Sequence, residues 1–491
     1  MTTAPMSRLA ARPDLRLGAA LAAAKLTSVG IRRLGRGGGT AAPGFVADRI
    51  DPALLGKLAA RLDRGAVVVA GTNGKTTVSR MLADVLEADG SRVVHNRSGS
   101  NLVRGVAAAF ADRASLAGDP RGDVGVIETD EAAFPEIVRR VAPRLVLLNN
   151  LFRDQLDRYG ELNAIAGHWR GALAALPPEA TVVVNADDPT LAAVTEGIAA
   201  RRVTFGLDNI DARYRLATLP HAADAATCRR CGHDLAYDAL YVSHLGAWRC
   251  PNCGAARPTL DVVGRDVDLR GVEALALTVA PGPGAVPRGG DGSAGGGVRL
   301  EVGVPGLYNA YNALATAAAA ASLGVPDATV AGALGAFQAP FGRIERVAFR
   351  GRTLTLALVK NPTGFNEVLR MLTAADGTLT VPTLLAINDL AADGRDVSWL
   401  WDVDFELLAD GDVPLATAGL RGADMANRLK YAGVATDRIR PLPADPRAAL
   451  EAFVATVPEG ATAYVLPTYT ALLELRRALA DLGAVETFWR Q

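Results

Sequence analysis

The stretch Ala66-Val67-Val68-Val69-Ala70-Gly71-Thr72-Asn73-Gly74-Lys75-Thr76-Thr77 decides the fold, because a short β-branched run passes through a glycine-rich turn into a helical pattern. Such a turn forms a phosphate cradle: backbone N–H groups and the helix N-terminus face the anion, lysine adds a charge, and the threonine hydroxyl can hold Mg²⁺. Valine stands at position 69, where the strict Walker A spacing has glycine, so this is a variant P-loop. The predicted phosphate-binding residues are Gly71, Thr72, Asn73, Gly74, Lys75, Thr76 and Thr77. The alternative is an ordinary strand-turn-helix with chance glycines.

Length and charge restrict the class of protein. The 491 residues predict about three domains. Lysine plus arginine and aspartate plus glutamate both number 52, which argues against a chain whose main role is to coat nucleic acid or an anionic membrane. The longest apolar runs fall short of a bilayer span, so no transmembrane segment is predicted. The apolar stretch Leu17–Ala24 ends at Lys25 without a cleavage site, which favours a helix or a loose tail over a signal peptide and predicts a cytoplasmic protein.

Short apolar runs alternate with helical stretches after the P-loop. The runs that we expect to be strands are Arg92–His95, Val124–Ile127, Leu145–Leu148 and Thr181–Val184. Polar residues follow them, as in a parallel α/β sheet whose ligands bind at the carboxyl ends of the strands. Glu128 follows one strand directly and is predicted to hold Mg²⁺ together with Thr76; the alternative is a solvent-facing acid near a helix N-terminus. Asp187 and Asp188 are typical of a loop or a helix cap and are not assigned to the site.

The four cysteines form a separate motif. Cys228 and Cys231, eighteen intervening residues, and then Cys250 and Cys253 have the spacing of a two-knuckle tetrahedral zinc site. Four thiolates leave no open coordination position, so we expect Zn²⁺ to be structural. Two disulfides are the alternative, which fits a reducing cytoplasm poorly.

The second half of the chain predicts a further α/β unit. The glycine- and proline-rich residues 281–298 are predicted to form a flexible loop. The stretch Val304–Asn309 then opens a long alanine-rich helix that runs to about Leu323. Strands are expected at Leu354–Val359, Leu384–Ile387, Leu415–Ala418 and Ala463–Leu466. We therefore predict an N-terminal segment (1–45), a central P-loop domain (46–350) with a zinc-ribbon insertion (225–256), and a C-terminal Rossmann-like α/β domain (351–491).

Together these motifs resemble the Mur ligase family. The resemblance rests on the Gly71–Thr77 loop, Glu128, Asn185-x-Asp-Asp, Gly306-x-x-Asn309 and Gly342-Arg343. Those enzymes join an amino group to a carboxylate through an ATP-derived acyl phosphate. The resemblance implies that Lys75 and Glu128 act at the transferred phosphate. It also implies that Asn309 contacts adenine, with a helix N-cap as the alternative, and that Arg343 reaches a phosphate.

Further stretches resemble the MurT branch of that family. They are Asn150–Glu161, Lys360–Glu367, Asp393–Asp402, Leu466–Leu473 and the four-cysteine insertion. This resemblance implies a synthetase subunit that amidates the D-glutamate α-carboxylate of the lipid II stem peptide to D-isoglutamine, in peptidoglycan biosynthesis at the inner face of the plasma membrane. It implies ATP, Mg²⁺ and Zn²⁺ as cofactors and a heterodimer with a GatD-like glutaminase that supplies ammonia.

The cysteine count also points to a partner, unless free ammonia is the nucleophile. A glutaminase needs an activated cysteine beside a histidine, and all four cysteines are assigned to zinc. By resemblance, one aspartate of the Asp393–Asp402 stretch completes the partner's catalytic triad. We favour Asp402 over Asp396 and Asp393 because it follows Trp399 and Trp401.

Two departures bear on the nucleophile. Typical amino-acid-adding Mur ligases carry a histidine where this chain has Gln155, and the C-terminal part lacks their amino-acid-recognition motif. Both are consistent with ammonia as the nucleophile. A stand-alone Mur or folylpolyglutamate-type ligase that adds an amino acid is the alternative enzyme. A zinc-ribbon ATPase that binds nucleic acid is the alternative from another class, and the ribbon is only weakly basic.

Overall fold

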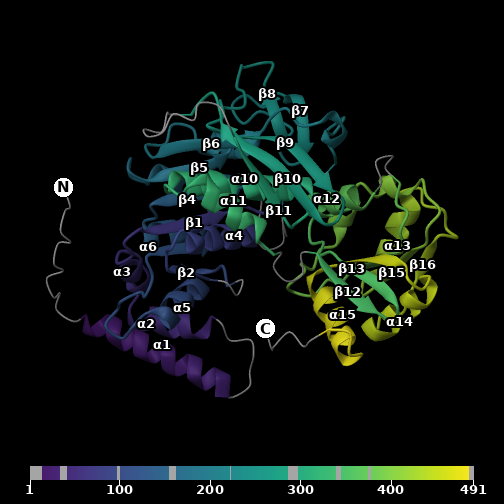
Figure 1. The fold of residues 1–491 in the computed structure, drawn as a ribbon, viewed down its shortest axis with the longest axis horizontal. Helices are drawn as coiled ribbons and strands as arrows, with labels where there is room; N and C mark the ends of the chain where they lie inside the picture. The colour runs from purple at the N-terminus through teal and green to yellow at the C-terminus, as the bar shows by residue number, and fades with distance from the viewer. Residues whose placement is uncertain are drawn as a thin grey trace.

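The computed structural model describes residues 14–33, 41–96, 100–153, 162–221, 223–285, 297–338, 344–373 and 378–485. Two α/β units lie side by side, each built on its own sheet (Figure 1). In these ranges, no helix is both long and apolar enough to cross a bilayer.

A nine-stranded sheet organises the first unit. Its strands are β1 (Ala66–Ala70), β2 (Val93–His95), β3 (Val124–Glu128), β4 (Leu145–Leu148), β5 (Thr181–Asn185), β6 (Arg201–Leu207), β9 (Val262–Arg270), β10 (Ala274–Pro281) and β11 (Val298–Val302). The order is β11-β10-β9-β6-β5-β4-β1-β3-β2. Neighbours from β2 to β9 pair in parallel, whereas β10 is antiparallel to both β9 and β11. The predicted parallel sheet is confirmed, with an antiparallel edge that was not predicted.

Helices cover both faces of this sheet because its central strands are apolar on both sides. Val67 and Val69 of β1 face a core shared with α4 (Lys75–Ala88), α10 (Leu307–Ser322) and α11 (Asp327–Gly335). Ala66, Val68 and Ala70 face the opposite core. The helices on that side are α1 (Leu15–Arg33), α2 (Ala42–Ile50), α3 (Leu54–Ala59), α5 (Val103–Arg113), α6 (Phe134–Val141), α8 (Leu162–Ala174) and α9 (Pro189–Val194). The β1 strand therefore lies at the centre of the unit and holds the P-loop rigidly.

The predicted ribbon insertion is a small antiparallel structure at the top of Figure 1. Strands β7 (Ala236–Val242) and β8 (Leu245–Arg249) pair as a hairpin, and a short 3₁₀-helix η1 (Ala212–Tyr214) precedes them. Isolated bridges, Thr227 to Asp234 and Arg249 to Ala256, close the two cysteine knuckles. The hairpin and both knuckles lie between residues 225 and 256.

A six-stranded sheet organises the second unit. Its strands are β12 (Glu345–Phe349), β13 (Arg352–Leu356), β14 (Thr383–Ala386), β15 (Leu415–Ala418), β16 (Ile439–Pro441) and β17 (Thr462–Pro467). The order is β12-β13-β17-β14-β15-β16, and all pairs except β12 with β13 are parallel. The helical segments are α12 (Pro362–Leu372), η2 (Ser398–Asp402), η3 (Phe405–Leu408), α13 (Gly422–Tyr431), α14 (Pro446–Thr456) and α15 (Tyr469–Asp481). A second α/β unit is thus confirmed.

The predicted domain limits do not coincide with the ends of these elements. Residues 350 and 351 form the turn of the β12–β13 hairpin, so a boundary there cuts the hairpin. At the other end, α2 runs across residue 45, and Leu17 and Leu21 of α1 belong to the same core as α5. Most of the predicted loop 281–298 lies outside the described residues.

Candidate functional site

The P-loop has the backbone that a phosphate cradle needs. Gly74 has φ +81° and is the N-cap of α4, which begins at Lys75. A Cβ at Gly74 would lie 2.1 Å from Asn312 Oδ1, so a side chain is excluded both by conformation and by space. The loop therefore presents backbone N–H groups and the positive end of the α4 dipole toward the carboxyl edge of the sheet.

Lys75 is buried in an ion pair that was not predicted. Its Nζ donates to Glu131 Oε1 at 2.9 Å and to the Thr72 carbonyl at 3.1 Å, and both charged side chains are under 10% exposed. An ammonium ion so far from water needs a counter-charge. Glu131 supplies this counter-charge in the structure, and a phosphate group supplies it in P-loops that hold a nucleotide. The only sequence signal for this role was its place three residues after Glu128.

The predicted metal ligands Thr76 and Glu128 lie together. Thr76 Oγ1 donates to Glu128 Oε1 at 3.0 Å, because β1 and β3 are neighbours and align Val69 with Glu128. Asn96 orients Glu128 from the other side: its side chain accepts from the Glu128 N–H and donates to the Glu128 carbonyl, each at 2.9 Å. A hydroxyl and a carboxylate beside a phosphate cradle are oxygen ligands of the kind that Mg²⁺ prefers.

A ladder of asparagines supports the loop from β4. Asn150 accepts from the Asn73 N–H at 2.8 Å and donates to the Asn73 carbonyl at 3.0 Å. Asn149 also donates to that carbonyl, at 3.1 Å, and to Asn312 Oδ1 at 2.9 Å. The predicted residues Thr72 and Thr77 are buried, and Thr72 exchanges hydrogen bonds with the Phe152 backbone. The loop conformation is therefore set before any ligand binds.

Asn309 joins this ladder at its far end. Its Nδ2 donates to the Pro305 carbonyl at 2.7 Å and its Oδ1 accepts from Asn312 at 2.9 Å. The N-cap of α10 is Gly306, so the alternative assignment of Asn309 as a cap is wrong. Its predicted contact with adenine stays a prediction. Arg343, the other predicted nucleotide contact, lies outside the described residues.

One residue of the second unit contacts the loop directly. Asn361 Nδ2 donates to Asn73 Oδ1 at 2.9 Å, while Asn361 Oδ1 accepts from the Gly364 N–H at 2.8 Å as the N-cap of α12. These contacts give a role to the Lys360–Glu367 motif. They also place the start of α12 at the phosphate cradle.

The four cysteines converge as their spacing predicts. Their Sγ atoms all lie within 4.8 Å of one another, with Cys228 to Cys253 at 3.6 Å and Cys231 to Cys250 at 3.5 Å. Four ligands 2.3 Å from one tetrahedral metal would be about 3.8 Å apart, so the cluster fits a metal such as zinc. His244 lies elsewhere, buried 3.6 Å from Asp188.

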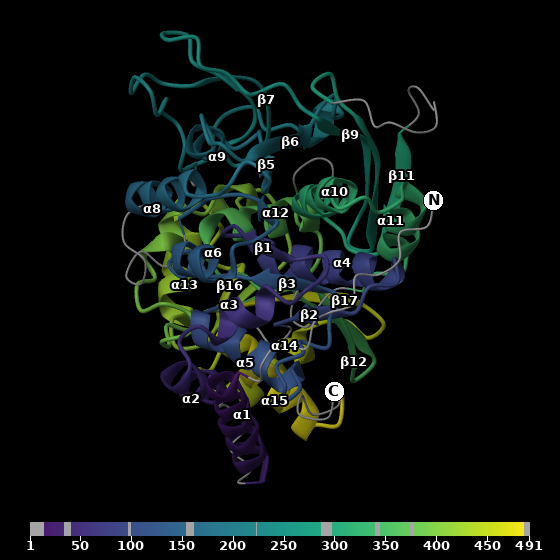
Figure 2. The same cartoon turned by 90° about the vertical axis from the view of Figure 1, so that its left-hand side faces the viewer.

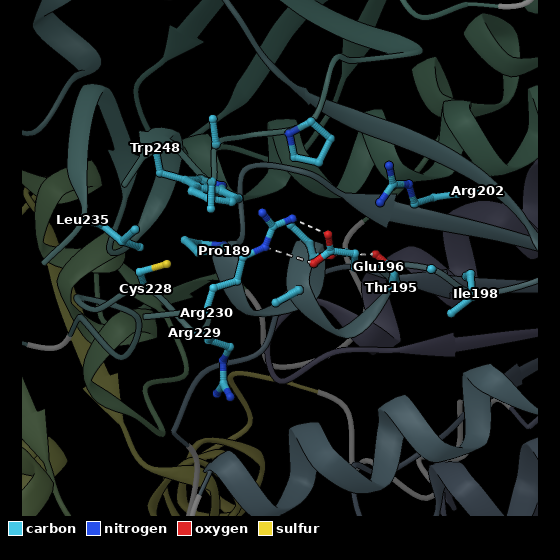
Figure 3. Close-up of a pocket in the computed structure, with 16 residues that line it drawn as sticks. Pro189, Thr195, Glu196, Ile198, Arg202, Cys228, Arg229, Arg230, Leu235 and Trp248 are labelled. Atoms are coloured by element: carbon cyan, nitrogen blue, oxygen red, sulfur yellow. Dashed lines mark hydrogen bonds and ion pairs between the residues drawn. The ribbon is translucent and has the colours of Figure 1, made fainter. Parts of the chain in front are cut away.

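A cavity of about 430 Å³ is lined by residues of the ribbon and of α9, which also pack together through Ala192 (Figure 3). Cys228, Leu235 and Trp248 line its ribbon side. Arg230 crosses it to pair with Glu196, and Arg229 donates to Asn163 at 2.9 Å. The ribbon arginines thus bind the protein's own surface.

A second cavity, of about 670 Å³, lies between the two units. From α12 it is lined by Thr363, Asn366, Glu367 and Arg370, and Gly306 and Leu307 of α10 lie opposite. Burial raises the pKa of Glu367, although Arg370 pairs with it at 2.7 Å. This cavity adjoins the residue pair that joins α12 to the P-loop.

The three candidate aspartates differ in their surroundings. Asp393 is buried and accepts from the Thr470 N–H at 2.8 Å and from the Thr470 hydroxyl. Asp396 accepts from Ser398 N at 2.8 Å, and these hydrogen bonds lower its pKa. The Asp402 side chain is 39% exposed, and among the described residues its carboxylate pairs with Arg153, at 3.7 Å. Of the three carboxylates, those of Asp393 and Asp396 accept backbone hydrogen bonds, whereas that of Asp402 contacts a side chain.

Asp187 and Asp188 are structural, as expected. Asp188 caps α9 by accepting from Thr190 N and Leu191 N. Asp187 accepts from Tyr311 at 2.7 Å and from Arg257 at 3.0 Å, and burial raises its pKa to about 6.

Together the fold and the site define an α/β P-loop protein with two sheets and a four-cysteine ribbon. The family model of the Mur ligase middle domain matches residues 69–234. The family model described as MurT ligase C-terminal matches residues 358–472. The subunit MurT of a Streptococcus pneumoniae lipid II isoglutaminyl synthase (glutamine-hydrolyzing) is 34% identical over 92% of this chain and 94% of its own length. The Staphylococcus aureus subunit of the same name is 28% identical over 84% of this chain and 87% of its own. The chain belongs to the MurT family.

Solved structures confirm the fold. A pseudomurein peptide ligase type C from Methanothermus fervidus superposes with a TM-score of 0.63 at 18% identity, over 85% of this chain and 78% of that one. MurF from Acinetobacter baumannii gives 0.62 at 16% identity, over 89% and 80%. Both share the Mur ligase arrangement of units.

Proposed function

We propose that this chain is the synthetase subunit of an enzyme that amidates the D-glutamate α-carboxylate of the lipid II stem peptide, using ATP, and forms D-isoglutamine for peptidoglycan. The observation that carries the proposal is the full-length similarity to the Streptococcus pneumoniae subunit, together with an intact phosphate cradle.

The chemistry explains why a cradle is needed. A carboxylate has no leaving group that ammonia can displace, so the γ-phosphoryl group of ATP is transferred to a carboxylate oxygen. Ammonia then attacks the carbonyl carbon of the acyl phosphate, and inorganic phosphate leaves with that oxygen. Catalysis consists mainly of alignment and of charge neutralisation at the transferred group.

Different residues of the cradle bind the phosphates and the metal ion. Lys75 leaves Glu131 for the β- and γ-phosphates, and the α4 N-terminus and the loop N–H groups hold the remaining oxygens. Thr76 and Glu128 would hold Mg²⁺, which neutralises phosphate charge. Asn361 joins the second unit to the loop. Asn309 and Arg343 are proposed to contact adenine and a phosphate.

We assign the four-cysteine cluster to one structural Zn²⁺. Four thiolates supply a closed tetrahedral shell, which stabilises the ribbon and leaves no position for substrate. The nucleic-acid alternative loses support because Arg229, Arg230 and Arg249 pair with Asn163, Glu196 and Asp238 of this chain.

The ammonia source that we propose is a GatD-like glutaminase in a heterodimer. Trp401 and Tyr431 are 50% and 70% exposed, and their ring centroids lie 5.7 Å apart. Exposed aromatic pairs are typical of interface hot spots. Asp402 follows Trp401 directly and is available to orient the partner's catalytic histidine. The proposed domains are a P-loop unit with the ribbon and a C-terminal unit that begins at β12.

The proposed site of action is the cytoplasmic face of the membrane, where a lipid-linked substrate is anchored. The test is incubation of the purified chain and its glutaminase with lipid II, ATP and glutamine, followed by mass spectrometry of the stem peptide. A primary amide on the D-glutamate α-carboxylate supports the proposal. A new amino acid at that carboxylate would instead establish the stand-alone ligase.

A further inference from the structure

The outer face of α1 carries an apolar stripe that no other element of the described residues covers. Leu15, Leu26 and Val29 are 80%, 73% and 40% exposed, and Ala19 is exposed between them. At 100° per residue these four side chains fall within an arc of about 80° on the helix. The buried residues Leu17, Ala20, Leu21 and Ala24 lie on the opposite side, so the helix is apolar on two faces.

Basic side chains flank this stripe. Arg16 projects about 100° to one side, and Lys25 and Arg32 project 80–100° to the other, by the same helical spacing. Arg16 and Lys25 donate to the carbonyls of Ile50 and Asp112, each at 2.7 Å, and no carboxylate of the described residues pairs with them. The acid nearest in sequence, Asp14, is paired with Lys57 at 2.7 Å.

The charge of this region differs from that of the whole chain. Residues 1–40 contain seven basic residues and one acidic residue, although the chain as a whole has no net charge. Apolar side chains between rows of lysine and arginine are the pattern of helices that lie in the plane of an anionic bilayer.

Helix α1 and its stripe lie at an outer edge of the molecule. In Figures 1 and 2, α1 forms an outer edge of the first unit, next to α2 and α5 and away from the ribbon. Helix α5 begins at Val103, two residues after Asn101. The Asn101 carbonyl accepts from the N–H of Asp130 at 3.0 Å, and Asp130 directly precedes Glu131. Helix α5 thus connects the core under α1 with residues beside the phosphate cradle.

We propose that the exposed face of α1 (Leu15, Arg16, Ala19, Lys25, Leu26, Val29 and Arg32) docks on an anionic lipid bilayer. This inference rests on the proposed function, because docking on a membrane would bring the site to a substrate that is anchored in the lipid. The helix is about 28 Å long and lies flat, with Leu15, Leu26 and Val29 entering the acyl boundary and the arginines contacting headgroup phosphates.

The test is flotation of the full-length chain with vesicles that contain no lipid II. We expect binding to phosphatidylcholine–phosphatidylglycerol vesicles and much weaker binding to phosphatidylcholine alone. Leu26→Glu should lower the partition coefficient at least tenfold, and Arg32→Ser about fivefold, because an apolar anchor contributes more than one surface charge. The matched control is Leu420→Glu, since Leu420 is a 55% exposed leucine of the second unit.

Three results would overturn the inference: no flotation with anionic vesicles, equal flotation of Leu26→Glu and the wild type, or equal losses in Leu26→Glu and Leu420→Glu. Concentration-dependent self-association without vesicle binding would assign the stripe to a second copy of the chain instead. Amidation of a water-soluble stem peptide is measured in parallel and should be unchanged in Leu26→Glu. If flotation holds and the wild-type complex fails to amidate lipid II itself, the proposed function is wrong and the surface stands.

Discussion

Lys75 and Glu131 form a buried ion pair, with Nζ 2.9 Å from Oε1, at the point where the P-loop meets the sequence after β3. Such a pair needs both partners, since removal of one leaves an uncompensated charge. We expect Glu131→Gln to lower the free energy of unfolding by about 2 kcal/mol without nucleotide. Saturating Mg-ADP should reduce this loss, because phosphate replaces the missing charge. Denaturant unfolding with and without nucleotide measures both values.

A surface pair provides the control for that measurement. Glu273 pairs with Arg346 at the surface, so Glu273→Gln should cost less than about 1 kcal/mol in either condition. If the loss in Glu131→Gln is the same with and without Mg-ADP, Lys75 does not transfer from Glu131 to phosphate.

The contact from Asn361 to Asn73 predicts a separable effect on nucleotide binding. Asn361→Ser keeps an N-cap for α12 but is too short to donate to Asn73. We expect a two- to tenfold rise in KM for ATP, equivalent to one hydrogen bond, with the unfolding midpoint close to that of the wild type. Steady-state kinetics give the answer, and an unchanged KM would mean that the contact contributes nothing to binding.

Cysteine replacement tests the metal assignment. Cys250→Ser should remove zinc and lower stability by several kcal/mol, since metal binding contributes directly to the folding of such sites. His233→Ala, within a knuckle but exposed, should retain the metal. Elemental analysis with thiol titration decides the question: a wild-type protein without zinc and with four titratable thiols contradicts the assignment.

The partner's triad is tested at Asp402. In the assembled complex, Asp402→Asn should reduce glutamine hydrolysis on the order of 100-fold or more, because the partner's histidine loses the group that orients it. Asp396→Asn should have little effect, since the Asp396 carboxylate is already engaged by the Ser398 N–H and hydroxyl. Complex formation is verified separately by gel filtration. Normal hydrolysis in an intact Asp402→Asn complex would exclude Asp402.

Asp187 predicts a pH dependence of stability. Its pKa is raised from 3.8 to about 6 by burial, so between these values the folded protein binds a proton that the unfolded chain has lost. The contribution of Asp187 therefore becomes less favourable as the pH rises from about 4 to 6, by at most roughly 3 kcal/mol, and is constant above that. The difference in unfolding free energy between the wild type and Asp187→Asn should show this trend. A flat difference over that range contradicts the shift.

Local motifs could be predicted from the sequence because their chemistry is contained in a few adjacent residues. The cradle from Gly71 to Thr77 and the four cysteines are of this kind, and so are the apolar strands on either side of β1. Contacts between distant segments could not be predicted: Asn361 meets Asn73 across 288 residues of sequence, and Glu131 reaches Lys75 only because β1 and β3 are neighbours.

The β12–β13 hairpin shows a signal that was overlooked. Arg350 and Gly351 both have positive φ, as a two-residue type I′ turn requires. Glycine between two short runs was thus the available hairpin signal at the predicted domain boundary, although Asn or Asp before it would have been a stronger one. The antiparallel edge of β9 to β11 carries a different signal, since β9 and β11 contain half-buried and exposed positions where the central strand β1 is wholly buried.

Transfer of oxygen from the substrate carboxylate to phosphate tests the central claim most directly. Lipid II labelled with ¹⁸O in the D-glutamate α-carboxylate is incubated with the complex, ATP and glutamine, and the inorganic phosphate is analysed by mass spectrometry. An acyl phosphate predicts one ¹⁸O in each phosphate released together with amide, and no labelled phosphate with Lys75→Ala. Amide formation with unlabelled phosphate would contradict the account.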